Sequence, residues 1–141
     1  MDSSELANVG SLLEAPSPAV LTTYRKDGSA LVSPVWFRFA DEAFEVVIAQ
    51  EDVKVRHLAR DPRVVLVVFE AIRPFRGVEA RGAAVLRPGD VGEARRSIAS
   101  RYLGAAAGDA FAAQRAAKPG VLLQLRPDTV RTWDLRAILP E

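Results

Sequence analysis

The sequence of 141 residues contains no cysteine and a single histidine. The absence of cysteine excludes disulfides, thiolate nucleophiles and cysteine-based zinc or iron–sulfur centres. His57 is therefore the sole imidazole for a catalytic triad, and the surrounding arginines disfavour the imidazolium that a general base must form. We interpret it as a partly exposed helix residue. Metal binding is also disfavoured, because the remaining ligands would be carboxylates flanked by arginines.

Several recognisable segments are missing as well. The N-terminal stretch lacks the basic start and apolar core of a signal peptide, and no apolar run approaches membrane-spanning length. Neither glycine motif for phosphate binding, GxGxxG or GxxxxGKS/T, has a match, and no basic stripe with interleaved aromatics indicates nucleic-acid binding. We therefore expect a cytoplasmic protein with no nucleic-acid and no membrane partner.

The composition is that of an ordinary globular domain. Hydrophobic residues make up 49% and charged residues 26% of the chain. The length is normal for one domain, so we expect residues 1–141 to form a single domain with its own core. The net charge is only +1, with 19 basic and 18 acidic residues. Any affinity for anions must therefore come from local clusters of charge.

The first half of the chain is typical of antiparallel β-structure. Segments 19–24 and 30–39 flank the dipeptide Asp27-Gly28, a strong hairpin signal because glycine accepts positive φ without steric cost. Segment 43–49 follows a polar turn and predicts a third strand. Three consecutive antiparallel strands predict the start of a meander.

The second half continues the β pattern. Segment 64–69, VVLVVF, is continuously apolar and β-branched, which predicts a strand covered on both faces. Segment 77–86 has Gly82 in its interior, where glycine indicates a bulge, a barrel corner or a close approach of another group. Two final strands are predicted at 120–127 and 129–135.

Helices are predicted between these strands. Leu6, Val9, Leu12 and Leu13 recur at helical spacing before Pro16. A short helix over 53–60 and a helical stretch over 89–116, with a second turn after Gly104, follow from the same periodicity. Strands dominate, so we expect a mainly β, α+β fold in which a small antiparallel barrel carries peripheral helices.

A basic cluster stands at the start of the predicted helix 53–60. Lys54 and Arg56 fall at the strand-to-helix junction, where free backbone N–H groups and the helix dipole suit a phosphate. An alternative interpretation is a solvated helix face, because Asp52 lies four residues before Arg56 and Asp61 follows Arg60. The residue pattern alone leaves both interpretations open.

Three segments together resemble a known family. These are VLTTYRKDGSALVSPVWFRF, KVRHLARDPRVVLVV and VEARGAAVL. They resemble the pyridoxamine 5'-phosphate oxidase-like split β-barrel superfamily, particularly its flavin and deazaflavin oxidoreductases that use coenzyme F420. The likeness extends over roughly residues 5–135, and its most specific part is the pattern KxRxLxRDPR from Lys54 to Arg63.

The resemblance implies an architecture and an assembly. It implies a split barrel of six or more mainly antiparallel strands, and a homodimer whose cofactor lies in a groove between the protomers. By position, Lys54 and Arg56 correspond to the family's phosphate-binding residues, and His57 stands where many relatives have asparagine.

The resemblance also implies which strand lies against the cofactor ring. That segment corresponds to Ser33, Pro34, Val35 and Trp36. Pro34 lacks a backbone donor, so we expect its strand to break there and leave backbone groups free for a planar ligand. Trp36 and Trp133 are candidates for the substrate side, with a structural role as the alternative.

The activity implied is hydride transfer between reduced coenzyme F420 and an unsaturated small-molecule substrate. The cofactor performs such chemistry, which is consistent with the lack of acid–base residues, and no catalytic residue is assigned. One alternative is an FMN-dependent oxidoreductase of the same fold, and another is a non-catalytic flavin-binding module. The C-terminal tryptophan-and-arginine signature of true pyridoxamine phosphate oxidases is absent from the ending RTWDLRAILPE, so vitamin B6 metabolism is not expected.

Overall fold

The computed structural model of the chain describes residues 3–141, and the side chains of residues 5–141. The strands are β1 (Ala19–Tyr24), β2 (Ala30–Val35), β3 (Arg38–Ala40), β4 (Ala43–Ala49), β5 (Arg63–Phe69), β6 (Gly77–Gly89), β7 (Gly120–Leu125) and β8 (Thr129–Trp133). The helices are α1 (Ser3–Ala7), α2 (Gly10–Glu14), α3 (Val53–Arg60), α4 (Gly92–Leu103), α5 (Ala105–Gln114) and the short 3₁₀ helix η1 (Arg136–Ile138).

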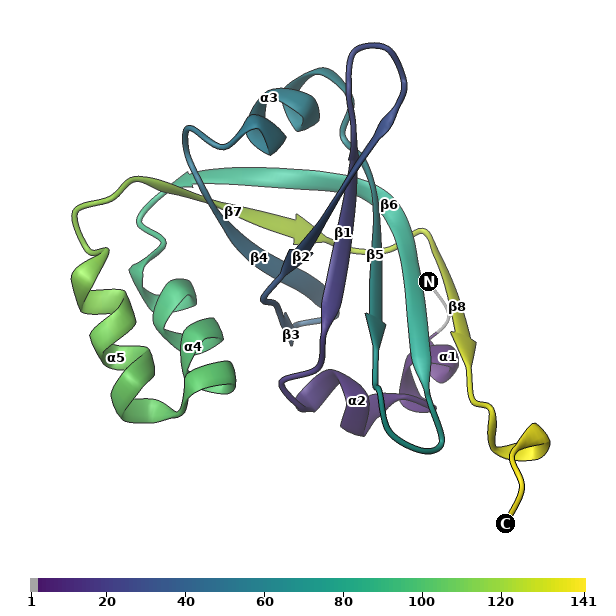
Figure 1. The fold of residues 1–141 in the computed structure, drawn as a ribbon. Coiled ribbons are helices and arrows are strands. Elements are labelled where there is room, and N and C mark those ends of the chain that lie inside the picture. The colour runs from purple at the N-terminus through teal and green to yellow at the C-terminus, as the bar shows by residue number, and fades with distance from the viewer. Residues whose placement is uncertain (1–2) are drawn as a thin grey trace.

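The strands form one strongly curled antiparallel sheet. Their order is β2-β1-β5-β6-β7-β4-β3, and β8 pairs with the edge of β6 opposite to β5. In the described part of the chain the two end strands, β2 and β3, do not pair with each other, so the barrel is split. Helices α1 and α2 lie at one end of the sheet, while α4 and α5 lie together beside it (Figure 1). The predicted fold class, a mainly antiparallel split barrel with peripheral helices, is confirmed.

The corner of the barrel lies in β6 at the predicted glycine. Residues 77–83 of this strand pair with β5, and residues 84–89 pair with β7. A Cβ atom on Gly82 would lie 3.1 Å from the side chain of Leu125 and 3.2 Å from the backbone nitrogen of Asp128. Only glycine leaves room for the β7–β8 connection at this bend, so the sequence signal marked both a corner and a close approach.

The core lies on the concave face of the sheet. In β5, the side chains of Val64, Leu66 and Val68 are buried, whereas Val65 and Val67 are only half-buried. The prediction that both faces of this strand are covered was therefore wrong for one face. The helices pack at the ends and edge of the sheet (Figure 1), so none of them covers the outer face of β5.

The predicted meander was also wrong. Strand β4 pairs with β3 and β7, while the β1–β2 hairpin continues the sheet through β5. The chain leaves β2 at Trp36 and Phe37, and Phe37 is fully buried in the core. Burial of Phe37 between the strands turns the chain into the other half of the barrel, which the hairpin pattern does not reveal.

The helical segments are broken more often than their periodicity predicts. Two short helices, α1 and α2, replace the single predicted N-terminal helix, but its four apolar residues are all buried: Leu6, Val9, Leu12 and Leu13. The stretch 89–116 divides into α4 and α5 at Gly104, whose φ is +87°. A second turn was predicted after Gly104, where the structure has the separate helix α5, and the positive φ explains why glycine stands at the break.

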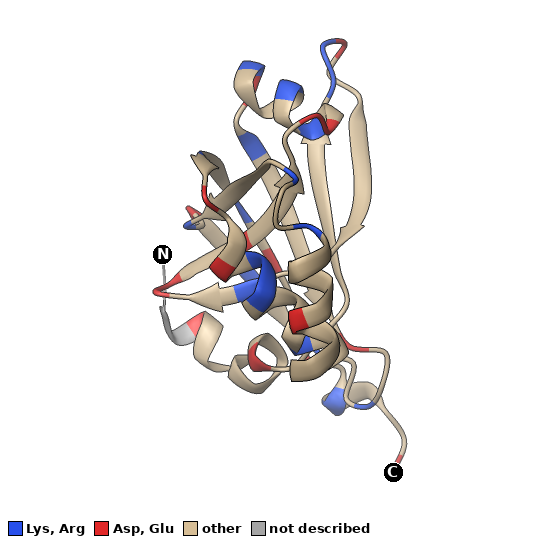
Figure 2. Cartoon of the chain, turned by 90° about the vertical axis from the view of Figure 1, so that its left-hand side faces the viewer, with Lys and Arg blue, Asp and Glu red and all other residues tan. Residues whose placement is uncertain are grey.

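The surface carries charges of both signs. Basic and acidic residues are interspersed over the face in Figure 2, which agrees with a net charge of +1. Among the helices formed by residues 3–141, none combines the length and the apolar composition needed to span a membrane.

Candidate functional site

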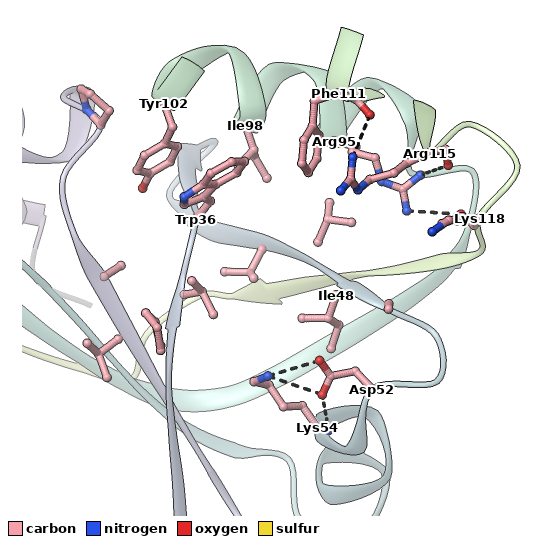
Figure 3. A pocket seen from close by; sticks show the side chains of 18 of the residues that line it. Trp36, Ile48, Asp52, Lys54, Arg95, Ile98, Tyr102, Phe111, Arg115 and Lys118 are labelled. Carbon is pink, nitrogen blue, oxygen red and sulfur yellow. Dashed lines mark hydrogen bonds and ion pairs between the residues drawn. The ribbon is translucent and has the colours of Figure 1, made fainter. Parts of the chain in front are cut away.

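A cavity of about 910 Å³ opens between the two halves of the fold. Its walls come from the start of β1, the end of β2, β4, the start of α3, and from α4, α5 and the segment that leads into β7. Figure 3 shows aromatic side chains on one side, the Asp52–Lys54 pair on another, and a group of basic side chains at the far end. The cavity therefore combines a flat apolar surface with charged ends.

The aromatic surface is built on Trp36, which directly follows β2 in the sequence. Its indole stacks on the ring of Tyr102 from α4, with centroids 5.2 Å apart and planes 11° apart. The ring of Phe111 from α5 lies 5.4 Å from Trp36 and is tilted by 49°. Trp36 remains 38% exposed, so part of its face is available to a planar ligand.

Hydrogen bonds hold Tyr102 in place. Its hydroxyl donates to the carbonyl oxygen of Ser17 at 2.9 Å and accepts from the backbone nitrogen of Phe37 at 3.3 Å. Burial raises the pKa of Tyr102 above its usual 10, so the phenol stays neutral at physiological pH. Two hydrogen bonds therefore fix the hydroxyl of Tyr102, and with it the ring that stacks on Trp36.

The N-terminus of α3 forms the second wall of the cavity. The carboxylate of Asp52 accepts a hydrogen bond from the backbone nitrogen of Lys54 at 2.8 Å and caps the helix. The same carboxylate pairs with the Lys54 ammonium at 3.2 Å, and the lysine side chain is only 13% exposed. The Asp52 carboxylate therefore occupies the place at the start of α3 where the sequence predicted a phosphate.

The structure separates the residues singled out from the sequence into two groups. Pro34, Val35, Trp36 and Lys54 line the cavity. Ser33, Arg56 and His57 are not among the lining residues: Ser33 is half-buried opposite Leu21 in the β1–β2 register, Arg56 is exposed on α3, and His57 is buried. The role of all seven in cofactor binding stays a prediction.

The break expected at Pro34 occurs two residues later. Pro34 pairs with Val20 inside β2, and the strand ends at Val35. Proline is accommodated because β2 is the first strand of the sheet and pairs only with β1 in the described residues. The strand therefore has no break at Pro34, and it is the turn at Trp36 that brings an aromatic ring to the strand end.

His57 is buried, so its interpretation as a partly exposed residue was wrong. Only 6% of it is exposed, and its Nδ1 lies 3.0 Å from Oγ1 of Thr23 in β1. Burial lowers the pKa of His57, with further lowering by the nearby charges of Arg60 and Arg25. A neutral imidazole that joins α3 to β1 is a structural contact outside the cavity lining.

The alternative interpretation of the basic cluster is partly correct. Asp61 pairs with Arg63 at 2.7 Å, as a solvated charged surface would, but Asp52 pairs with Lys54 and not with Arg56. Among the described residues, no group of three or more histidine, aspartate and glutamate side chains is arranged to hold a metal ion.

Sequence reasoning missed the basic end of the cavity. Arg95 from α4, with Arg115 and Lys118 after α5, lines this end. A signal was present, because Arg95 lies four residues after Val91 and three before Ile98, on the face of α4 that packs inward. An arginine within an apolar helical stripe indicates a buried guanidinium with a specific task. Trp133, in contrast, packs over Gly77 and is not among the cavity-lining residues.

Comparisons with known proteins agree with the architecture. The sequence model of the family described as pyridoxamine 5'-phosphate oxidase matches residues 7–134. A search of curated proteins finds no match. Among solved structures, a conserved hypothetical protein from Mycobacterium tuberculosis is 23% identical with a TM-score of 0.77, covering 100% of this chain and 90% of that one.

Two further solved structures are similar over most of their length. An F420 reductase is 27% identical with a TM-score of 0.69, covering 86% of this chain and 94% of that one. HutZ, the haem storage protein from Vibrio cholerae, is 15% identical with a TM-score of 0.65, covering 92% of this chain and 94% of that one. The same fold thus occurs in a reductase and in a storage protein.

Proposed function

The chain belongs to the pyridoxamine 5'-phosphate oxidase family, and from that premise we propose that its cavity binds coenzyme F420 and supports hydride transfer to or from an unsaturated small molecule. The flat surface of Trp36, stacked on Tyr102 inside a cavity of about 910 Å³, is the observation that carries the proposal. Similarity to an F420 reductase at 27% identity supports the choice of cofactor.

The cavity suits a cofactor with a planar ring and a phosphate. Ligand cavities typically enclose about 300–1,000 Å³, so this one is large enough for a ring system with space beside it for a substrate. Pro34, Val35 and Ile48 supply apolar surface near Trp36. Lys54, at the start of α3, is the lining residue placed to contact a phosphate when Asp52 releases it.

The protein's own residues have positioning tasks. When bound, the cofactor supplies the hydride chemistry, so no acid–base pair is required from the chain. The apolar side chains of Pro34, Val35 and Ile48 hold the ring and exclude water, while Tyr102 keeps Trp36 in place as a flat surface beside the ring. The sole histidine, His57, forms a hydrogen bond with Thr23 and does not line the cavity, which is consistent with a site that needs no acid–base residue from the protein.

An FMN-dependent oxidoreductase is the second candidate, and one observation favours it. Lys54 is already paired with Asp52, and Glu51 also lines the cavity. These carboxylates repel the polyanionic tail of the deazaflavin more than the single phosphate of FMN. A non-catalytic flavin-binding module is the third candidate.

Expression in a host that does not make the deazaflavin separates the candidates. Colourless protein that binds added coenzyme F420, and binds FMN more weakly, supports the proposal. Yellow protein with bound FMN assigns the second candidate. Binding of neither cofactor at concentrations that saturate other family members would contradict both enzymatic assignments.

Substitution of the basic residues tests the anchoring role. Lys54→Ala should weaken cofactor binding about ten- to hundredfold, the effect of losing one charge-assisted hydrogen bond. Arg56→Ala tests the exposed residue of the same cluster separately. Lys26→Ala removes an exposed lysine of the β1–β2 turn as the matched control. Unchanged affinity in the Lys54 variant would rule out phosphate anchorage at α3.

We also propose that the protein acts as a homodimer. The outer face of β1, β2 and β5 is apolar: Val32 is 59% exposed, and Val20, Val65 and Val67 are half-buried. Pro34 belongs to the same face and lines the cavity, so a second copy seated here would also close the site. Light scattering should give a dimer for the wild type and a monomer for Val32→Lys. Val85→Lys, at another exposed valine, should remain dimeric.

A further inference from the structure

The charge of the cavity is distributed unevenly between its two ends. At the α3 end, Lys54 is neutralised by Asp52, and Glu51 lies nearby. At the other end lie three cations, Arg95, Arg115 and Lys118 (Figure 3). Within residues 5–141, whose side chains the structure describes, no carboxylate forms an ion pair with any of these three. The uncompensated positive charge therefore lies at the end away from α3.

Arg95 fixes the backbone of this basic end. Arg95 is only 8% exposed, and its guanidinium donates to the carbonyl oxygens of Arg115 at 2.7 Å and Lys118 at 3.2 Å. Gly120 makes room for the guanidinium, because a Cβ atom there would lie 2.8 Å from its Nη2. Arg95 is thus a positioning residue that holds Arg115 and Lys118 at the cavity wall.

Arg115 is connected to the aromatic surface. Its guanidinium lies over the ring of Phe111, with 3.7 Å from Cζ to the ring centroid, and Phe111 in turn lies 5.4 Å from Trp36. Arg115 is half-buried, and its guanidinium is held by the Phe111 ring and by a 3.5 Å hydrogen bond to the Phe111 carbonyl oxygen instead of a carboxylate. A planar molecule in contact with Trp36 and Phe111 would meet a cation at its edge.

We propose that Arg115 and Lys118 form an anion subsite that binds the carboxylate of a planar, unsaturated substrate lying on the Trp36–Phe111 surface. The inference rests on the proposed function, because it leaves the α3 side of the cavity to the cofactor. Arginine binds a carboxylate through two parallel hydrogen bonds, and the exposed ammonium of Lys118 adds a second charge. The substrate class is therefore an α,β-unsaturated or aromatic carboxylic acid.

The test uses Trp36 as an internal probe. The chain has two tryptophans, so Trp133→Phe leaves Trp36 as the sole fluorophore of this type. In that background, 4-nitrobenzoate and its neutral analogue 4-nitrobenzamide are titrated against protein without cofactor, and quenching of Trp36 gives both affinities. The carboxylate should bind at least about tenfold more tightly than the amide.

Two double variants separate the subsite from general charge effects. Arg115→Gln with Lys118→Gln should abolish the preference for the carboxylate while leaving amide binding unchanged. Arg96→Gln with Lys26→Gln removes the same two charges at sites outside the cavity lining and should preserve the preference. The backbone carbonyls that accept from Arg95 survive substitution of Arg115 and Lys118, so thermal unfolding midpoints should stay close to that of the wild type.

Two results would overturn the inference. The first is an equal preference for the carboxylate in both double variants. The second is that saturating FMN competes with 4-nitrobenzoate and that the Arg115–Lys118 substitutions also lower the affinity for FMN. These cations would then bind the phosphate of the cofactor. Because the probe titration needs no cofactor, a carboxylate preference in protein that binds neither FMN nor coenzyme F420 would sustain the subsite while rejecting the proposed function.

Discussion

The Nδ1 atom of His57 in α3 lies 3.0 Å from the Oγ1 atom of Thr23 in β1, and both side chains are buried. This hydrogen bond fixes α3 against the sheet. Lys54 stands three residues earlier in the same short helix, so the contact also determines how the α3 wall faces the cavity. His57, which does not line the cavity, thereby positions Lys54, which does.

Replacing Thr23 with valine should lower the free energy of unfolding by about 1–3 kcal/mol, because the buried imidazole loses its partner while the shape of the side chain is kept. Urea denaturation measures the loss. Thr129→Val, at an exposed position of β8, is the control and should change stability by less than about 0.5 kcal/mol. Equal effects at both positions would show that the hydrogen bond contributes nothing specific.

Stability should fall as the pH decreases through the ordinary titration range of histidine. The pKa of His57 is lowered below 6.5, first by burial and then by Arg60, Arg25 and Arg56. Between the folded and the unfolded pKa, the unfolded chain binds more protons, so the free energy of unfolding rises with pH across this window and is highest above it.

Denaturation curves between about pH 8 and 5.5 measure this dependence, in a range where carboxylates hardly titrate. Since His57 is the only histidine, His57→Gln should remove the slope. Retention of the full slope in that variant would assign the proton uptake to another group.

Asp52→Asn should strengthen the binding of a phosphate-bearing cofactor by about two- to tenfold, because it releases the Lys54 ammonium from its ion pair. Asparagine caps helices as well as aspartate does, so stability should change little. Fluorescence titration with FMN measures the affinity. Asp61→Asn, at the other end of α3, removes a carboxylate that pairs with Arg63 and should leave the affinity unchanged. Weaker binding in the Asp52 variant would mean that Lys54 does not contact the phosphate.

Gly108→Ala should destabilise the protein by about 1–3 kcal/mol through overpacking between α4 and α5. A Cβ atom at Gly108 would lie 2.6 Å from the Cα of Ser100, so the two helices would have to separate. Gly10→Ala, in α2 with no atom within 4 Å of its Cβ position, should be neutral or stabilising by up to about 1 kcal/mol. Thermal unfolding compares the two, and a neutral Gly108 variant would show that the α4–α5 contact adapts without cost.

Local signals determined the elements of the fold. The dipeptide Asp27-Gly28, the apolar stretch of β5, and the glycines at 82 and 104 predicted a hairpin, a strand, a corner and a helix break that the structure contains. Each of these depends on backbone conformation or on the periodicity of neighbouring side chains, and both are encoded within a few residues. The family resemblance, carried by short continuous motifs, was readable for the same reason.

The sequence also identified part of the candidate site, namely Lys54 and the segment from Pro34 to Trp36. Only the tertiary structure decided which polar side chains bind one another. Asp52 forms an ion pair with Lys54, and His57 points inward and hydrogen-bonds to Thr23. Arg95 donates to the backbone carbonyl oxygens of Arg115 and Lys118. These pairings depend on side-chain direction and on contacts between segments far apart in the chain, which local patterns do not specify. The electrostatic polarity of the cavity is for that reason a property of the folded protein, set by which side chains the barrel and the α4–α5 pair bring together.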